Sequence, residues 1–143
     1  ASAPRAGYAT PLRMTRNEWR YYICCVLNVR EELIKSERAV VQELVNHMLG
    51  AGQWLDQQQA HRDKAVAIAA GRKYFNQDPN ILKFVMENPT DRVTYGDLRM
   101  IRAEFEELMQ LSIEAGTLKA PVAYEKYMDE SFARAAKPTA ITL

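Results

Sequence analysis

Residues 37–58 read ERAVVQELVNHMLGAGQWLDQQ, and this stretch decides the fold. Its apolar side chains recur mostly at intervals of three and four residues, as they do along one face of an α-helix. The members of this apolar stripe are Val41, Leu44, Val45, Met48, Leu49 and Leu55. The spacing predicts a helix of about six turns from near Glu37 to Gln58. Gly50 and Gly52 either weaken its second half, by up to about 1 kcal/mol each relative to alanine, or allow a neighbouring element to approach closely.

Two more helices are predicted after this stretch. Residues 63–75 carry one helical pattern. Asp78-Pro79 opens a shorter helix, because an aspartate N-cap followed by proline favours a helix start. Asn88-Pro89 ends that helix, since the residue before a proline is disfavoured in helical conformation.

The last part of the chain is predicted to contain a loop and two further helices. Residues 90–99 form the connecting loop, whose Gly96 could adopt a positive φ angle. Residues 101–112 define an amphipathic helix, and Gly116 lies where a left-handed C-cap residue belongs. A last short helix is expected to begin with Asp129 as its N-cap.

Residues 19–29 carry the one strong strand signal of the sequence. The segment WRYYICCVLNV is dense in aromatic and β-branched residues, which favour strands, and the apolar run from Ile23 to Leu27 favours burial on both faces. Such a strand needs sheet partners, which the rest of the sequence scarcely offers. The predicted fold class is therefore α/β but predominantly helical, with one strand near residues 20–29 followed by about five or six helices.

Composition limits the classes of protein to consider. The 143 residues, of which 48% are hydrophobic and 26% charged, are typical of one globular domain. We expect an irregular amino-terminal segment over 1–18, a domain over 19–136 and a loose tail over 137–143. The formal net charge of +1 provides no global field that would attract nucleic acid.

The titratable residues predict no metal site and no cofactor. His47 and His61 are separated along the chain and do not belong to a His-Glu-x-x-His motif. Cys24 and Cys25 are the only cysteines, and their adjacency disfavours both a structural disulfide and a thiolate zinc site. We expect them to be buried, as free cysteines commonly are. The chain is predicted not to be an enzyme, although sequence alone leaves a spatially assembled triad open.

Arg20 and its neighbours are the candidates for ligand binding. Trp19, Tyr21 and Tyr22 flank it, and aromatic walls with a few polar groups are typical of small-ligand clefts. The same aromatic residues fit a core or an edge strand equally well. The arginines at the start of the chain give a local positive bias that suits an anion, although surface solubility is the simpler explanation. These arginines are Arg5, Arg13, Arg16 and Arg20.

The order of several short motifs resembles the carboxy-terminal part of the substrate-binding proteins that serve ABC importers of the nitrate/sulfonate/bicarbonate class. The resemblance covers about residues 19–136. Its motifs are, in order, YICCVLNVREEL at 22–33, VVQELV at 40–45, GAGQWLD at 50–56, DRVTYGDLR at 91–99, LMQLSIEAG at 108–116 and YMDESF at 127–132. No single motif is specific, and the specificity lies in their shared order. Trp19-Arg20 stands where family members often carry histidine-proline.

This resemblance implies a periplasmic-binding-protein-like II fold with two lobes, of which the chain would be the carboxy-terminal portion. It implies capture of a small, often anionic solute by hinge closure, and delivery to the permease of an ABC importer from the periplasm or another extracytoplasmic compartment. Family members are considerably longer, so much of the ligand cleft is expected to lie outside these residues. The site residues that the resemblance assigns are Arg20, Tyr21, Tyr22 and Cys24.

Two other functions remain open beside solute capture. One is a non-transport sensor or protein-interaction domain of the same fold, which would associate with itself or a partner through surface that the missing lobe normally covers. The other is an enzyme of thiamine-precursor synthesis that shares the fold, which would require a histidine-rich segment absent from this sequence. The identity of the solute, the permease and the oligomeric state, and whether the chain is a fragment or a short native paralogue, are likewise open.

Overall fold

The computed structural model describes residues 2–19 and 22–143 of the chain. The described residues form α-helices and one 3-10 helix, and none of them lies in a β-strand. The elements are α1 (Ser2–Arg5), α2 (Thr15–Glu18), α3 (Glu31–Ser36), α4 (Arg38–Gln57), α5 (Gln59–Ala69), α6 (Pro79–Glu87), α7 (Arg102–Glu114), η1 (Tyr124–Lys126) and α8 (Ser131–Ala135). The predominantly helical character expected from the sequence is therefore confirmed.

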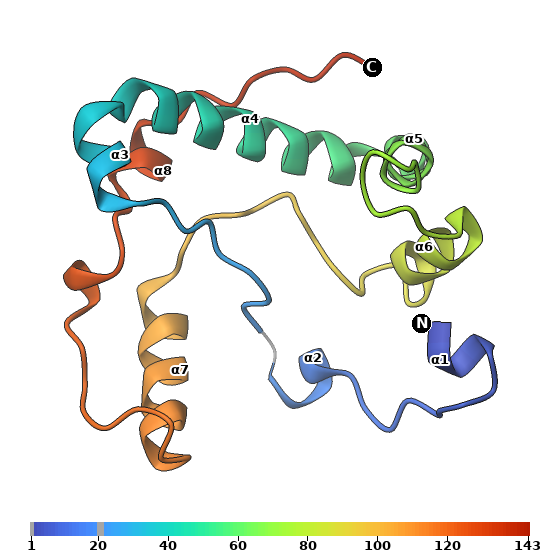
Figure 1. Ribbon diagram of the computed structural model, residues 1–143, viewed down its shortest axis with the longest axis horizontal. Helices are drawn as coiled ribbons and strands as arrows, with labels where there is room; N and C mark the ends of the chain where they lie inside the picture. The colour runs from blue at the N-terminus through green and yellow to red at the C-terminus, as the bar shows by residue number, and fades with distance from the viewer. Residues whose placement is uncertain (1, 20–21) are drawn as a thin grey trace.

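The strand predicted near residues 20–29 is not formed by the described part of that segment. Residues 22–30 have no regular secondary structure and lead directly into α3 (Figure 1). The physical reason is the absence of a second strand among the described residues, because a lone strand cannot pair its own backbone groups. The side chains of Val26 and Leu27 are consequently exposed instead of buried on both faces.

Helix α4 packs against three other helices of the described residues. It contacts α3 and α8 near its beginning and α5 beyond its end (Figure 1). Its buried face differs in part from the predicted apolar stripe, since Leu44 and Met48 are exposed. The buried positions are Val41, Asn46, Gly50, Gly52 and Trp54. Three of these five are not aliphatic or aromatic residues, so polar and backbone contacts add to the packing of the half-buried Val45, Leu49 and Leu55.

The two glycines of α4 are points of close backbone approach. A Cβ atom on Gly50 would lie 2.0 Å from the carbonyl oxygen of Thr139, and one on Gly52 would lie 2.3 Å from that of Tyr95. Real Cβ atoms do not tolerate such distances, so only glycine allows these segments to lie against the helix. Of the two interpretations of these glycines, the one that predicts close approach of a neighbouring segment is therefore confirmed.

The carboxy-terminal tail runs along α4 (Figure 1), whereas the sequence predicts it to be loose. The amide nitrogen of Thr139 donates to the carbonyl oxygen of Asn46 at 3.0 Å. The amide nitrogen of Lys137 donates to Oδ1 of the same asparagine at 3.0 Å, and Gln42 Nε2 donates to that oxygen at 3.1 Å. Asn46 is buried, so these contacts satisfy a polar side chain that would otherwise be costly to bury.

The predicted helix starts and stops are largely confirmed. Asp78 Oδ1 accepts from the amide nitrogen of Asn80 at 2.8 Å at the start of α6. Gly116 follows α7 with φ +71°, as a left-handed C-cap residue does. The last helix differs by one residue, since the N-cap of α8 is Glu130 and not Asp129, although Asp129 Oδ1 still accepts from the amide nitrogen of Ser131 at 2.9 Å.

Two local predictions differ from the structure. The helix expected over 63–75 is α5, which begins earlier and ends at Ala69, because Gly71 accepts backbone hydrogen bonds from Tyr74 and Asn76 in a turn that replaces the last helical residues. Gly96 does not adopt a positive φ angle. Its lack of a side chain instead lets it lie close to Asp56, since a Cβ atom on Gly96 would be 3.3 Å from Asp56 Oδ2.

The buried apolar core of the described residues is small. Its members are Val41, Trp54, Val66, Phe105, Tyr124 and Phe132. No large side chain of the described residues is less than 2% exposed. Many large apolar side chains face solvent, and the helices leave an open arrangement (Figure 1). Within the described residues no helix has both the length and the apolar character that crossing a bilayer requires.

Candidate functional site

The predicted binding residues lie around the start of the segment 22–30. Arg20 and Tyr21 are outside the described residues. Tyr22 is 44% exposed, and its ring lies 5.6 Å from the ring of Trp19 between centroids. The structure thus brings the half-buried Trp19 and the exposed Tyr22 together.

Cys24 and Cys25 are exposed, free thiols, which corrects the expectation that they are buried. They are exposed because the segment carrying them has no sheet in which to be covered. Cys25 Sγ donates a hydrogen bond to Cys24 Sγ at 3.6 Å. The interaction with Cys25, first through the hydrogen bond between the two thiols and then through charge, raises the pKa of the Cys24 thiol.

Asp56 and Arg62 form a partly buried ion pair between the end of α4 and α5, in which Arg62 is the buried partner. Oδ2 of Asp56 also accepts from the amide nitrogens of Tyr95 and Gly96, each at 2.6 Å. Burial by itself would raise the pKa of Asp56, but the hydrogen bonds from Tyr95, Arg62 and Gly96 outweigh it and hold the pKa below its ordinary value. The carboxylate is therefore kept charged by its neighbours.

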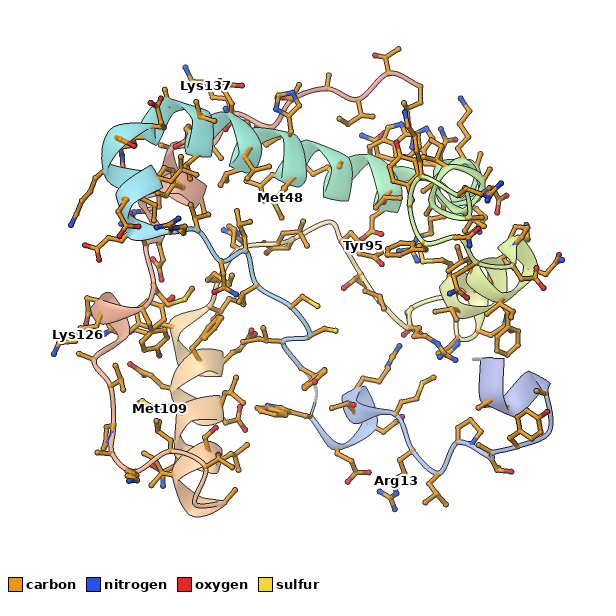
Figure 2. All side chains as sticks on the ribbon, viewed as in Figure 1. Arg13, Met48, Tyr95, Met109, Lys126 and Lys137 are labelled. Atoms are coloured by element: carbon orange, nitrogen blue, oxygen red, sulfur yellow. The ribbon has the colours of Figure 1, made fainter. Side chains whose placement is uncertain are left out.

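Arg62 joins this carboxylate to two more parts of the chain. Its guanidinium donates to the carbonyl oxygens of Met86 at 3.5 Å, Thr90 at 3.4 Å and Val93 at 3.2 Å. Figure 2 shows Tyr95 beside α5 and α6, and the Arg62 guanidinium carbon lies 5.8 Å from the centre of its ring. We call Asp56, Arg62, Tyr95 and Gly96 the polar junction. Its charges are satisfied by protein groups, so its chemistry is that of a structural clamp.

The sequence interpretation did not single out Arg62, although a signal was present. Arg62 lies four residues before Val66, the other buried residue of α5, so the two share one helical face. A cation on a buried face requires a partner. The nearest upstream carboxylate is Asp56, at the end of the preceding helix.

The two histidines take structural positions. The ring of His61 stacks on that of Trp54, with 4.2 Å between centroids and 8° between planes. Its Nδ1 donates to the Trp54 carbonyl oxygen at 2.6 Å, since a carbonyl only accepts. Nδ1 of His47 lies 2.7 Å from the carbonyl oxygen of Glu43 on the exposed side of α4. Among the described residues no group of three or more histidine, cysteine or acidic side chains could hold a metal ion.

Two open hollows on the surface are lined by apolar side chains. One, of about 260 Å³, lies between α7 and the chain that follows it, near the position of Met109 in Figure 2. The other, of about 450 Å³, lies between α4, α5, the turn at 74–75 and the end of the tail. Neither presents the charged side chain that a small anion would require. These hollows are suited to covering by other polypeptide.

No protein-family model, curated protein or solved structure matches the chain. Its function is therefore inferred from the residues and their arrangement.

Proposed function

We propose that the chain is the helical, carboxy-terminal portion of a two-lobed solute-binding protein of the nitrate/sulfonate/bicarbonate class. In this proposal the protein captures a small anionic solute outside the cytoplasm and delivers it to the permease of an ABC importer. The observation that carries the proposal is that several of the motifs behind the resemblance pack against one another. Contacts between the motifs give a structural reason for these motifs to occur together in one chain.

The motif at 50–56 rests on the motif at 91–99. Gly52 lies against the carbonyl oxygen of Tyr95 and the side chain of Leu98. Asp56, the last residue of the first motif, accepts hydrogen bonds from Tyr95 and Gly96 in the second. Gly52 and Asp56 thus both hold the 90–99 loop against α4. This contact supports the interpretation that the two motifs belong to one structural unit.

The motif at 127–132 closes on the beginning of α4. Phe132 is buried, and the Arg38 guanidinium carbon lies 4.1 Å from the centre of its ring. Gln42 Nε2 donates to the carbonyl oxygen of Phe132 at 3.0 Å. The terminal motif therefore anchors α8 to the same helix that carries the motifs at 40–45 and 50–56.

The exposed apolar surface supports a larger assembly around this helical unit. Val26 and Leu27 in the segment 22–30 and the two apolar hollows are uncovered. Soluble proteins seldom leave large contiguous apolar patches open to water. In a two-lobed solute-binding protein, the remaining polypeptide would cover them.

Arg20 is the residue that we assign to the anion, together with Tyr21, Tyr22 and Cys24, which follow it in the sequence. A guanidinium presents paired donors that match the oxygens of nitrate, sulfonate or bicarbonate. Aromatic rings would form the wall of the cleft. Lobe closure on the bound anion would then produce the form that the permease recognises.

Isothermal titration calorimetry on the protein produced from its complete gene tests this proposal. Nitrate, ethanesulfonate and bicarbonate are titrated separately, with chloride at equal ionic strength as the reference. We expect saturable binding of one of the three, lost in Arg20→Gln and kept in Arg13→Gln, the matched control whose side chain pairs with Glu18. Binding that Arg20→Gln leaves unchanged would remove Arg20 from the site, and absence of binding by all three would refute the proposal.

A second candidate is a non-transport interaction domain that associates with a second copy of itself. The observation that favours it is the pair of apolar hollows, which lack directed polar groups. Sedimentation velocity distinguishes the two functions. A stable dimer that shows no response to the three anions would favour self-association over solute capture.

A further inference from the structure

Cys24 and Cys25 form an exposed pair of thiols that the proposed function leaves largely unused. They are the only cysteines of the chain. Both are free and exposed, in a segment without regular secondary structure. Their sulfur atoms lie 3.6 Å apart and share a hydrogen bond. Two accessible sulfurs at this separation are suited to binding one atom between them.

Backbone geometry opposes a direct bond between these sulfurs. The Cα atoms of consecutive residues lie about 3.8 Å apart across a trans peptide. Ordinary disulfides need a Cα separation of about 4.4 Å or more, and shorter separations store strain that makes the bond easy to reduce. A disulfide between Cys24 and Cys25 would therefore be strained.

A single bridging atom fits the observed separation. Two thiolates bound to one tetrahedral metal with bonds of about 2.3 Å lie about 3.8 Å apart. The smaller bond angle at a pyramidal, three-coordinate centre brings two sulfur ligands somewhat closer together, so the 3.6 Å found here is within reach of either geometry. A closed metal site would need further protein ligands, and the described residues offer no cluster of three or more. The best match is a centre that requires only two sulfur ligands from the protein.

We propose that Cys24 and Cys25 form a bidentate site for a thiophilic centre, best matched by trivalent arsenic that carries one organic substituent. An arsenoxide, R–As=O, reacts with both thiols to form two arsenic–sulfur bonds. Two sulfur–hydrogen bonds and the arsenic–oxygen bond break, and the two protons leave with the oxygen as one water molecule. Arsenic remains trivalent, so no oxidant or reductant takes part. This site shares Cys24 with the residues assigned to the anion, but binding of the arsenical requires only the two thiols and does not rest on solute capture.

Phenylarsine oxide is the probe for this site, and the intact chain is the sample. Intact mass is expected to show one phenylarsenic group per chain, and titration with a thiol reagent is expected to show the loss of both thiols together. A dithiol such as 2,3-dimercaptopropanol should remove the group, whereas the same concentration of thiol groups supplied as a monothiol should not. The difference reflects the effective concentration of the second sulfur once the first has bound.

Cys24→Ser and Cys25→Ser are the decisive variants. Each keeps one thiol, so each should still react with a maleimide but hold the arsenical more weakly by a factor on the order of 100. Circular dichroism checks that helix content is unchanged, as expected for exposed positions. Uptake of two arsenicals per chain, no uptake, or equal retention by a single-cysteine variant would each overturn the proposal.

Discussion

Asp56 is the residue at which the polar contacts between α4 and the 90–99 loop converge. Its carboxylate pairs with Arg62 and accepts two backbone hydrogen bonds. Side-chain exposure is 22% for Asp56 and 10% for Arg62, so loss of one partner leaves a charge that water reaches poorly. At this scale the stability of the fold depends on a few satisfied polar groups.

Asp56→Ala is expected to lower the free energy of unfolding by about 3 kcal/mol. The substitution removes the carboxylate that pairs with Arg62 and that accepts from the amide nitrogens of Tyr95 and Gly96. Urea denaturation followed by circular dichroism measures the change. Asp97→Ala is the matched control, since Asp97 pairs with Arg99 on the surface and should cost less than about 1 kcal/mol. Similar losses in both variants would show that the junction is not a clamp.

The same carboxylate has an expected effect on the pH dependence of stability. The pKa of Asp56 in the folded chain lies below its ordinary value of 3.8, so the folded state favours the charged form. Its contribution is complete above pH 3.8 and is lost as the pH falls through the folded pKa. The difference in unfolding free energy between the wild type and Asp56→Asn should therefore narrow below pH 3.8. A difference that stays constant down to pH 2.5 would contradict the assignment.

The elements pack through close approach at two glycines of α4. In an isolated helix, Gly50→Ala would stabilise by up to about 1 kcal/mol. Here the added Cβ would meet the Thr139 carbonyl oxygen at 2.0 Å, so the tail must move. We expect the variant to lose about 1–3 kcal/mol of stability and its Thr139 amide to exchange faster with deuterium.

A chain shortened to end at Ala136 supplies the control for this substitution. Without residues 137–143, the added Cβ of Gly50→Ala does not meet the Thr139 carbonyl oxygen, so the substitution should be neutral or stabilising. The two single changes and their combination form a double-mutant cycle. A destabilising effect of equal size in both backgrounds would show that the tail does not rest on Gly50.

The ends of helices were predictable from the sequence where a residue's own conformational preference marks them. The packing between segments that are distant in the sequence was not predictable. Asp78-Pro79 and Gly116 mark helix ends through their own conformational preferences. The aromatic and β-branched run at 19–29 reports how well residues suit a sheet and cannot report whether partner strands exist. The docking of the tail depends on Asn46 and Gly50, which lie about 90 residues earlier in the chain.

At the scale of the whole molecule, the described residues bury few large apolar side chains and leave many exposed. The sequence motifs predicted a helical unit belonging to a larger two-lobed protein, and this uncovered surface is compatible with that proposal. The sequence predicts a binding site near residues 20–24, and that location stays a prediction. Cys24 and Cys25 were expected to be buried because free cysteines commonly are, and they are exposed because no sheet covers the segment that carries them.

Anion-dependent thermal unfolding of the protein produced from its complete gene tests solute capture most directly. A ligand present at 100 times its Kd adds about 2.7 kcal/mol to the free energy of unfolding, which corresponds to a rise in Tm of about 5–10 °C. We expect such a rise with nitrate, ethanesulfonate or bicarbonate, and its loss in Arg20→Gln. A Tm that is the same with all three anions and with chloride would contradict solute capture.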